Sequence, residues 1–219
     1  MSAWNFNDDV RQSRLTGWRA PPGHVRSRCR SAWIGLGGCR EGKAATLKVL
    51  LNQEQLRDGV AQLAEKIAAH YGDRPLTIVA IMTGSLIFLA DLSRLLKMPV
   101  RISLIQASSY RGGTEPGQLW IRDDMMLDVR GRDVLVLDDI FDTGKTLHEV
   151  MGCVSQMGPG SVASAVLLHK VGRQQVSSLP DFVAFQIPDQ FVVGYGLDYR
   201  DLYRNLPFVA ILESQDLEA

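Results

Sequence analysis

Residues 134–146 read VLVLDDIFDTGKT, a stretch that joins three features typical of ligand sites in α/β proteins. Its first four residues are apolar and rich in β-branched side chains, as expected for a fully buried parallel strand. Three carboxylates follow, from Asp138, Asp139 and Asp142. Residues 143–146 then open a segment with helical spacing. Because the backbone N–H groups and the dipole at a helix start favour an anion, this order predicts a site for a phosphorylated ligand.

Length and composition predict one domain with a sizeable core. The chain has 219 residues, of which 46% are hydrophobic, and 24 basic residues balance 24 acidic ones. The charge is uneven, since residues 1–46 hold eight Lys and Arg against three Asp and Glu, for a net charge of +5. The remaining residues therefore carry −5. That acidic balance makes nucleic-acid binding by the domain an unfavoured interpretation.

Cysteine usage and hydropathy give the expected compartment. The three cysteines lie far apart and show no metal-ligand spacing, which is typical of free thiols in a reducing compartment. No apolar run approaches the roughly 18–20 residues of a membrane span, and the first residues lack the apolar core of a signal peptide. We therefore expect a cytoplasmic protein without a membrane partner.

Residues 1–46 differ from the rest of the chain. They are rich in Arg, Gly and Ser and show no sustained period, so we predict a largely disordered extension with no role in catalysis. The alternatives are a basic arm for RNA or acidic surfaces, a targeting peptide, and a start codon placed too far upstream. The predicted domain occupies residues 47–219.

Strands and helices alternate along that domain, which predicts a mostly parallel sheet with crossover helices. Asn52 and Gln55 form a variant of the capping box that begins a helix. The polar segment 108–118 predicts a mobile lid between two antiparallel strands. Broken β segments near both ends suggest a small subdomain over the carboxyl edge of the sheet. We expect strands at 47–51, 76–82, 100–107, 119–123, 134–137, 162–168, 182–187, 191–193 and 206–212.

The acidic stretch has two near-matches that the residues exclude. A phosphate-binding P-loop would need glycine where Asp139 stands, and an aspartyl-phosphate phosphatase would need an acid where Ile140 stands. The remaining pattern suits a ribose 5-phosphate group. Adjacent carboxylates can accept hydrogen bonds from two ribose hydroxyls, and the following turn can hold the phosphate. The structural alternative is a turn whose acids only cap the helix.

The stretch resembles the 5-phosphoribosyl 1-pyrophosphate (PRPP) binding motif of type I phosphoribosyltransferases. From Leu47 to Leu212 the chain is similar to hypoxanthine-guanine phosphoribosyltransferases. The similarity includes the run IMTGS at 81–85, the pair Ser109-Tyr110, Lys170 after a strand, and the run FVVGYGLDY at 191–199. The last run is specific to the purine branch.

This resemblance implies a type I phosphoribosyltransferase fold with a small hood subdomain. The implied activity is purine salvage. The phosphoribosyl group of PRPP passes to N9 of hypoxanthine or guanine with Mg²⁺, giving IMP or GMP and pyrophosphate. A homodimer or homotetramer is the implied assembly.

The resemblance also implies residue roles on the PRPP side. Asp138 and Asp139 would hold the ribose hydroxyls and, together with Asp198, Mg²⁺. The 5-phosphate would bind to Thr143, Gly144, Lys145 and Thr146. Pyrophosphate would bind to Thr83, Gly84 and Arg204, with a non-proline cis peptide at Met82-Thr83. Family members often have Glu at position 138 and Lys or Arg at position 83, so this chain departs from the pattern there.

On the purine side, the resemblance implies that Asp142 contacts N7 and serves as general acid and base. Lys170 would donate a hydrogen bond to O6, which disfavours adenine because its 6-amino group is itself a donor. Phe191 would stack on the base, and the Val192 backbone would bind its edge. Ser109 and Tyr110 would close over the reaction centre.

Two further interpretations of the sequence stay open. An RNA-binding operon attenuator can be built on the same fold, although the charge of −5 on residues 47–219 and the presence of Asp142 disfavour it. A phosphoribosyltransferase that prefers xanthine is the other, and nothing in the sequence decides between xanthine and the other 6-oxopurines.

Overall fold

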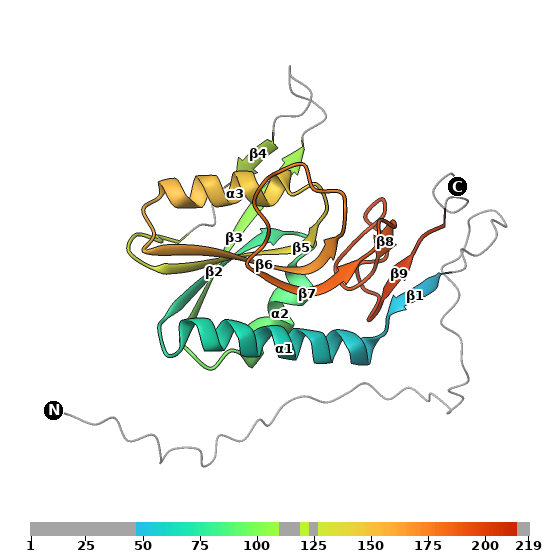
Figure 1. The fold of residues 1–219 in the computed structure, drawn as a ribbon, viewed down its shortest axis with the longest axis horizontal. Helices are drawn as coiled ribbons and strands as arrows, with labels where there is room; N and C mark the ends of the chain where they lie inside the picture. The colour runs from blue at the N-terminus through green and yellow to red at the C-terminus, as the bar shows by residue number, and fades with distance from the viewer. Residues whose placement is uncertain (1–46, 110–118, 123–126, 214–219) are drawn as a thin grey trace, which may run out of the picture. The chain divides into compact units, whose positions relative to one another are not determined.

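The computed structural model describes residues 47–109, 119–122 and 127–213. Its main sheet has six strands in the order β4-β3-β2-β5-β6-β7, all parallel to their neighbours except β4, which runs antiparallel to β3 (Figure 1). This arrangement confirms the predicted mostly parallel sheet and the antiparallel pair around segment 108–118. The strands are β2 (Leu76–Met82), β3 (Val100–Ser109), β4 (Leu119–Arg122), β5 (Asp133–Phe141), β6 (Ser161–Lys170) and β7 (Phe182–Ile187).

A separate small sheet joins the first and last strands of the described chain. Its order is β1-β9-β8, with β1 (Lys48–Leu51), β9 (Val209–Ile211) and β8 (Val192–Val193) all antiparallel. The strand predicted at 206–212 is shorter than expected, because the Leu206 carbonyl accepts a hydrogen bond from the Tyr195 N–H instead of pairing in the sheet.

Three helices cover the main sheet, α1 (Gln53–Tyr71) and α2 (Leu86–Leu95) on one face and α3 (Lys145–Gln156) on the other (Figure 1). The predicted capping box is confirmed, since Asn52 and Gln55 exchange backbone-to-side-chain hydrogen bonds at the start of α1.

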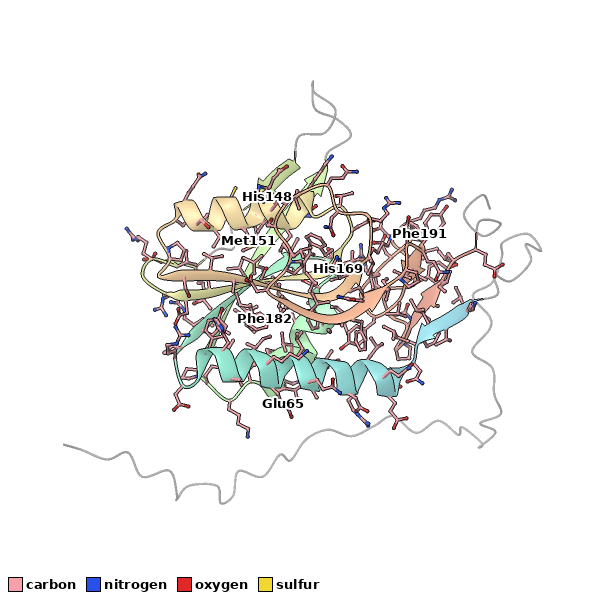
Figure 2. The ribbon with its side chains drawn as sticks, in the orientation of Figure 1. Glu65, His148, Met151, His169, Phe182 and Phe191 are labelled. Atoms are coloured by element: carbon pink, nitrogen blue, oxygen red, sulfur yellow. The ribbon has the colours of Figure 1, made fainter. Side chains whose placement is uncertain are left out.

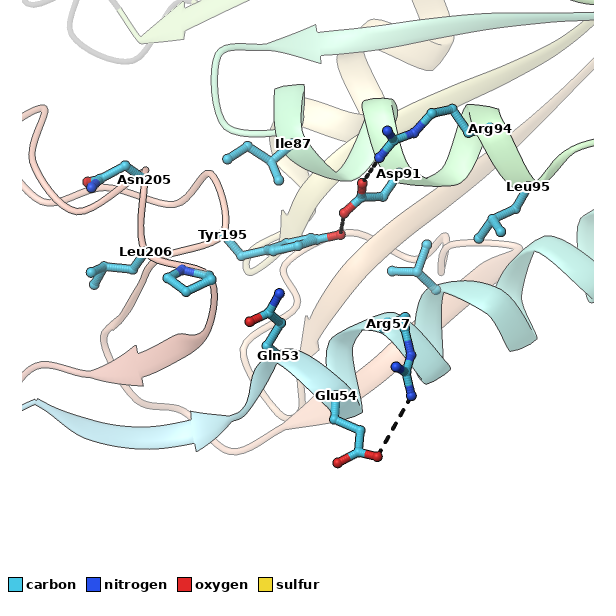
Figure 3. Close-up of a pocket in the computed structure, with 12 residues that line it drawn as sticks. Gln53, Glu54, Arg57, Ile87, Asp91, Arg94, Leu95, Tyr195, Asn205 and Leu206 are labelled. Atoms are coloured by element: carbon cyan, nitrogen blue, oxygen red, sulfur yellow. Dashed lines mark hydrogen bonds and ion pairs between the residues drawn. The ribbon is translucent and has the colours of Figure 1, made fainter. Parts of the chain in front are cut away.

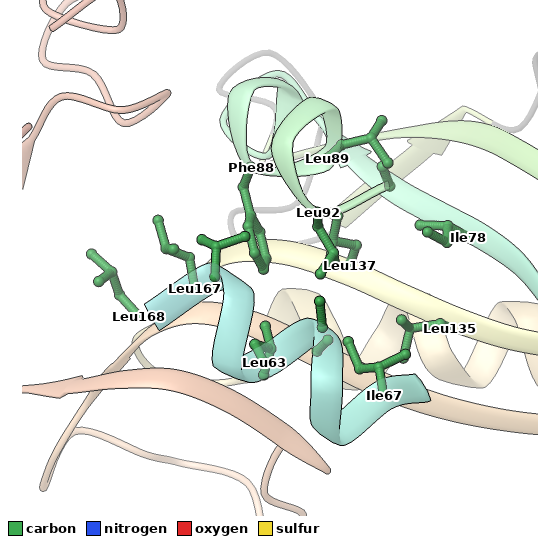
Figure 4. Packing of buried hydrophobic residues seen from close by; sticks show 14 of the residues in the cluster. Leu63, Ile67, Ile78, Phe88, Leu89, Leu92, Leu135, Leu137, Leu167 and Leu168 are labelled. Atoms are coloured by element: carbon green, nitrogen blue, oxygen red, sulfur yellow. The ribbon is translucent and has the colours of Figure 1, made fainter. Parts of the chain in front are cut away.

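The central strand β5 is packed on both faces. Leu135 and Leu137 belong to the apolar cluster with α1 and α2 (Figure 4). Val134 and Val136 belong to the cluster with α3. All four side chains are fully buried. Because burial of each contributes about 1.5–3 kcal/mol, this strand anchors the two layers and confirms the predicted buried strand.

β2 and β5 diverge at their carboxyl ends. β2 pairs with β5 only as far as Ala80 and Leu137, while β5 stays paired with β6 as far as Phe141. The chain leaves β2 toward β3 on one side and leaves β5 toward β6 on the other. Such a switch in direction leaves a crevice at the carboxyl ends of the strands, where open α/β sheets bind ligands.

Asp138 and Asp139 lie within β5 and not after it, so the predicted end of this strand at Leu137 is wrong. Hydrogen bonds from β6 extend the strand, with Asp138 opposite Val166 and Ile140 opposite Leu168. β6 likewise continues two residues beyond its predicted end, through Lys170. Residues 1–46 and most of the predicted lid, including Tyr110, lie outside the described residues. No helix in the described ranges is long and apolar enough to cross a membrane.

Candidate active site

A cavity of about 300 Å³ occupies the crevice between β2 and β5. Five segments line it: the end of β2 with the β2–α2 turn, β3 at Ala107, the end of β5, the β5–α3 turn with the start of α3, and the loop that follows β8. The fold thus brings together residues that are far apart in the sequence. The predicted site residues on its wall are Gly84, Asp138, Asp139, Asp142, Thr143, Gly144, Thr146, Asp198 and Arg204.

Two adjacent carboxyl groups lie at the centre of this cavity. Asp138 is 6% exposed, and its Oδ1 accepts a hydrogen bond from the Asp139 N–H at 3.0 Å. Burial, followed by the charge of Asp139, raises the pKa of Asp138 well above its usual range. Burial also raises the pKa of Asp139, and this rise is partly offset by hydrogen bonds and by the positive charge of Arg204, which both lower the pKa. The pair is therefore suited to a ligand that offers hydroxyl donors or positive charge.

Asp138→Asn is expected to make the ligand-free protein more stable at neutral pH. The unfolded chain releases the Asp138 proton near pH 4, whereas the folded protein holds it to a higher pH, so wild-type stability falls as pH rises through that window. Each unit of raised pKa costs about 1.4 kcal/mol of the free energy of unfolding. Urea unfolding at pH 4.5 and pH 7.5 measures the difference.

The exposed Asp128 gives the matched control, because its hydrogen bonds to Arg130 lower its pKa. Asp128→Asn should therefore bring no gain in stability as pH rises. If the difference in stability between wild type and Asp138→Asn is the same at both pH values, the pKa of Asp138 is not raised in the folded protein.

Two backbone segments, the turn at Gly84 and the loop at Gly196, meet beside Asp139 with no space for a side chain. Gly84 lies against the carboxylate, since a Cβ there would be 1.7 Å from Asp139 Oδ2. Gly196, at φ +104°, lies against Gly84 in turn, since its Cβ would be 2.0 Å from the Gly84 carbonyl oxygen. The Met82-Thr83 peptide before Gly84 is cis, as predicted. These contacts place backbone groups next to the buried acids.

The loop after β8 carries the positive charge of the cavity. Arg204 Nη2 lies 2.8 Å from Asp198 Oδ1, and Arg204 Nη1 donates to the Gly196 carbonyl at 2.7 Å. The same loop is tied to α2, because the Tyr195 hydroxyl donates to Asp91 Oδ2 at 2.6 Å (Figure 3). A second cavity, of about 770 Å³, lies beside that hydrogen bond and contains none of the predicted site residues.

The third acid of the stretch, Asp142, is held by two cations. Lys170 Nζ lies 3.2 Å from Asp142 Oδ2, and Arg173 Nε donates to Oδ1 at 2.9 Å. Lys170 is only 7% exposed, so it is a buried partner of Asp142 and not a solvated lysine at a strand end. Sequence reasoning missed Arg173, which stands in a connection without a motif and reaches Asp142 only through the fold.

The turn from β5 into α3 offers backbone donors. Gly144 precedes the helix at φ +83°, and Thr143 Oγ1 accepts from the Lys145 N–H at 3.5 Å. The N-cap residue, Gly144, has no side chain that could bind the following N–H groups, and both Gly144 and Thr146 line the cavity at this helix start. This geometry suits an anion.

The cavity wall does not include five of the predicted residues, namely Thr83, Lys145, Lys170, Phe191 and Val192. Phe191 is 40% exposed (Figure 2). It contacts Tyr199 edge to face, with ring centroids 5.5 Å apart, and Val192 is buried in β8. Ser109 ends β3, and Thr83 immediately precedes Gly84. No group of three His, Cys, Asp or Glu side chains able to hold a metal ion occurs in the described part of the chain.

Comparison with known proteins identifies relatives of this chain. The model of the phosphoribosyl transferase domain matches residues 47–200. The hypoxanthine-guanine phosphoribosyltransferase of Staphylococcus epidermidis is 39% identical over 168 residues, which cover 76% of this chain and 94% of that protein.

Solved structures of phosphoribosyltransferases are also similar to this chain. A crystal structure of a Bacillus anthracis hypoxanthine-guanine phosphoribosyltransferase has a TM-score of 0.72 at 36% identity, covering 78% of this chain and 99% of that one. A structure of Trypanosoma cruzi hypoxanthine phosphoribosyltransferase has a TM-score of 0.72 at 36% identity. It comes from a study of how the C-terminal region of that enzyme affects oligomeric state and activity. It covers 81% of this chain and 96% of its own.

Proposed function

Because the chain belongs to the hypoxanthine-guanine phosphoribosyltransferase family, we propose that it is a purine-salvage enzyme that makes IMP or GMP from PRPP and hypoxanthine or guanine. The observation that carries the proposal is the cavity at the switch point, where two buried carboxyls, an open helix start and a lysine-paired acid meet. Pyrophosphate is the other product.

The PRPP side of the reaction would use the divergent ends of β2 and β5. Asp138 and Asp139 would accept hydrogen bonds from the ribose hydroxyls, and the burial of Asp138 would strengthen its bond. Residues 143–146 would bind the 5-phosphate through the N–H groups at the start of α3. Gly84 would offer its backbone to pyrophosphate, and Arg204 would add positive charge.

Mg²⁺ fits the donors that the cavity offers. The ion binds oxygen, keeps several waters, and is commonly held by one or two carboxylates together with substrate phosphates. Asp138, Asp139 and Asp198 supply carboxylate oxygens on the cavity wall, which would hold the ion with PRPP without a protein-only cluster of three acids. Bound there, Mg²⁺ would offset the negative charge of pyrophosphate.

The purine side would use the pair of Asp142 and Lys170. With N7 of the base near Asp142 and O6 near Lys170, the carboxylate holds and releases the N7 proton while the ammonium group donates to the carbonyl. A 6-amino group would face Lys170 with a donor and offer the buried ammonium group no acceptor on the base. Phe191 would stack on the base, since its ring is partly exposed beside the small sheet.

A spectrophotometric assay tests this function. Wild-type protein with PRPP and Mg²⁺ should convert hypoxanthine and guanine at least about 100-fold more efficiently than adenine, because the donor at O6 discriminates between them. Xanthine serves as the fourth base and measures the preference among 6-oxopurines. Turnover of adenine as efficient as that of hypoxanthine, or no nucleotide from any of the four bases, would refute the proposal.

We further propose that the protein assembles as a homodimer or homotetramer. Support comes from the Trypanosoma cruzi relative, whose oligomeric state was studied together with its activity. Light scattering on the purified protein gives the mass directly, and a monomer at the concentration of the assay would exclude this assembly as a requirement for activity.

A further inference from the structure

The two oxygens of Asp142 have different partners. Oδ2 lies 3.2 Å from Lys170 Nζ, and Oδ1 accepts from Arg173 Nε at 2.9 Å. The two cations come from different places, because Lys170 ends β6 and Arg173 lies in the connection to β7. The carboxylate is therefore held from two directions.

The two partners differ in what they can do when a base binds. In the proposed function, on which this inference rests, Lys170 donates to O6 of the purine, so its hold on Oδ2 is shared with the substrate. Arg173 has no role toward the substrate in that function, and its Nη1 is already engaged 3.2 Å from Asp189 Oδ2. Oδ1 thus keeps its partner while Oδ2 becomes available to the N7 proton.

Arg173 also joins two parts of the purine subsite. Asp189 stands two residues before Phe191, in the connection between β7 and β8. The planar guanidinium donates to Asp142 through Nε and to Asp189 through Nη1, a geometry that lysine cannot reproduce. The acid of the reaction and the segment that carries the stacking ring are therefore linked by one side chain.

We propose that Arg173 is a positioning residue that fixes Asp142 Oδ1 and sets the distance between Asp142 and the Phe191 segment, leaving Oδ2 for proton transfer at N7. Such a residue acts on turnover through Asp142 and has no contact with the ribose or the pyrophosphate. Its loss should lower kcat and raise the KM for hypoxanthine, but leave the KM for PRPP unchanged.

The test compares Arg173→Gln with Arg173→Lys and with Arg130→Gln. Arg130 is the matched control, because it is an exposed arginine that also pairs with an aspartate, Asp128, away from the cavity. Arg173→Gln should lower kcat with hypoxanthine about 10-fold, as expected when a reacting group is misplaced, with the KM for PRPP within about 2-fold of wild type. Arg173→Lys should recover part of the kcat, and Arg130→Gln should match wild type.

A double-mutant cycle separates positioning from a structural role. If Arg173 acts through Asp142, then Arg173→Gln should lower kcat no further in an Asp142→Asn background. The proposal would be overturned if the two separate losses of kcat multiply in the double variant. It would also be overturned if the kcat of Arg173→Gln equals that of Arg130→Gln. If Arg173→Gln is unstable by thermal unfolding, Arg173→Lys and Asp189→Asn carry the same comparison. Failure of the proposed function itself is distinct, because wild type would then form no IMP.

Discussion

Asp142→Asn is expected to lower kcat with hypoxanthine by about 10²–10⁴-fold while PRPP still binds. Removal of a positioned general acid and base costs a rate factor of this order, because the amide can neither take nor return a proton. The side chain keeps its size and can still accept a hydrogen bond from Arg173, so the fold should persist. Steady-state assays give kcat, and calorimetric titration with PRPP and Mg²⁺ gives the affinity of the donor site.

Asp189→Asn is the control for this change. Asp189 accepts from the same arginine but lies outside the cavity wall, so its amide variant should lose far less than the Asp142 variant. An unchanged kcat for Asp142→Asn would remove the acid-base assignment. Loss of PRPP affinity comparable to the loss of turnover would instead place Asp142 on the ribose side.

Gly196→Ala is expected to disrupt both the fold near the cavity and the binding of PRPP. Position 196 combines φ +104°, which side chains rarely adopt, with a backbone carbonyl 2.0 Å from the place of a Cβ. Since the opposing atom is the backbone of Gly84, the loop must move away from the β2–α2 turn. We expect a loss of roughly 2–4 kcal/mol in the free energy of unfolding and a KM for PRPP raised at least about 10-fold.

Gly172→Ala is the control that separates the cost of the backbone conformation from the cost of the steric clash at position 196. Gly172 has φ +85°, but no atom lies within 4 Å of the place that a Cβ would take, so only the conformational cost remains. That variant should lose roughly 1 kcal/mol and keep its KM for PRPP. Urea unfolding and steady-state kinetics measure both variants. Equal losses of stability and equal KM values would show that the contact between Gly196 and Gly84 has no effect of its own.

The local pattern at 134–146 was enough to predict one strand, the turn after it and the helix that follows. Four apolar residues, three acids and a glycine turn determine a strand, a cavity wall and a helix start, all within one segment. The end of that strand was misplaced, because the hydrogen bonds that extend β5 through Phe141 come from β6, which begins 20 residues after it ends. The residues of β5 themselves contain no signal for pairing with a strand at that distance in the sequence.

Contacts between side chains from distant segments were the least predictable part of the site. Arg173 reaches Asp142, and Tyr195 reaches Asp91, across separations of 31 and 104 residues. Neither pair belongs to a motif, and each depends on the register of strands and the path of a loop. The lid around Tyr110 stays a prediction, because it lies outside the described residues.

The pairing of β1 with β9 has a consequence for the order of folding. These two strands begin and end the described chain, so the small sheet can close only after the segments between them are compact, and closure of so long a loop is entropically costly. The central strands can pair earlier, because β5 and β6 are neighbours in sequence. We therefore expect the small sheet, which holds the Phe191 segment through β8, to assemble last and to open first in hydrogen exchange.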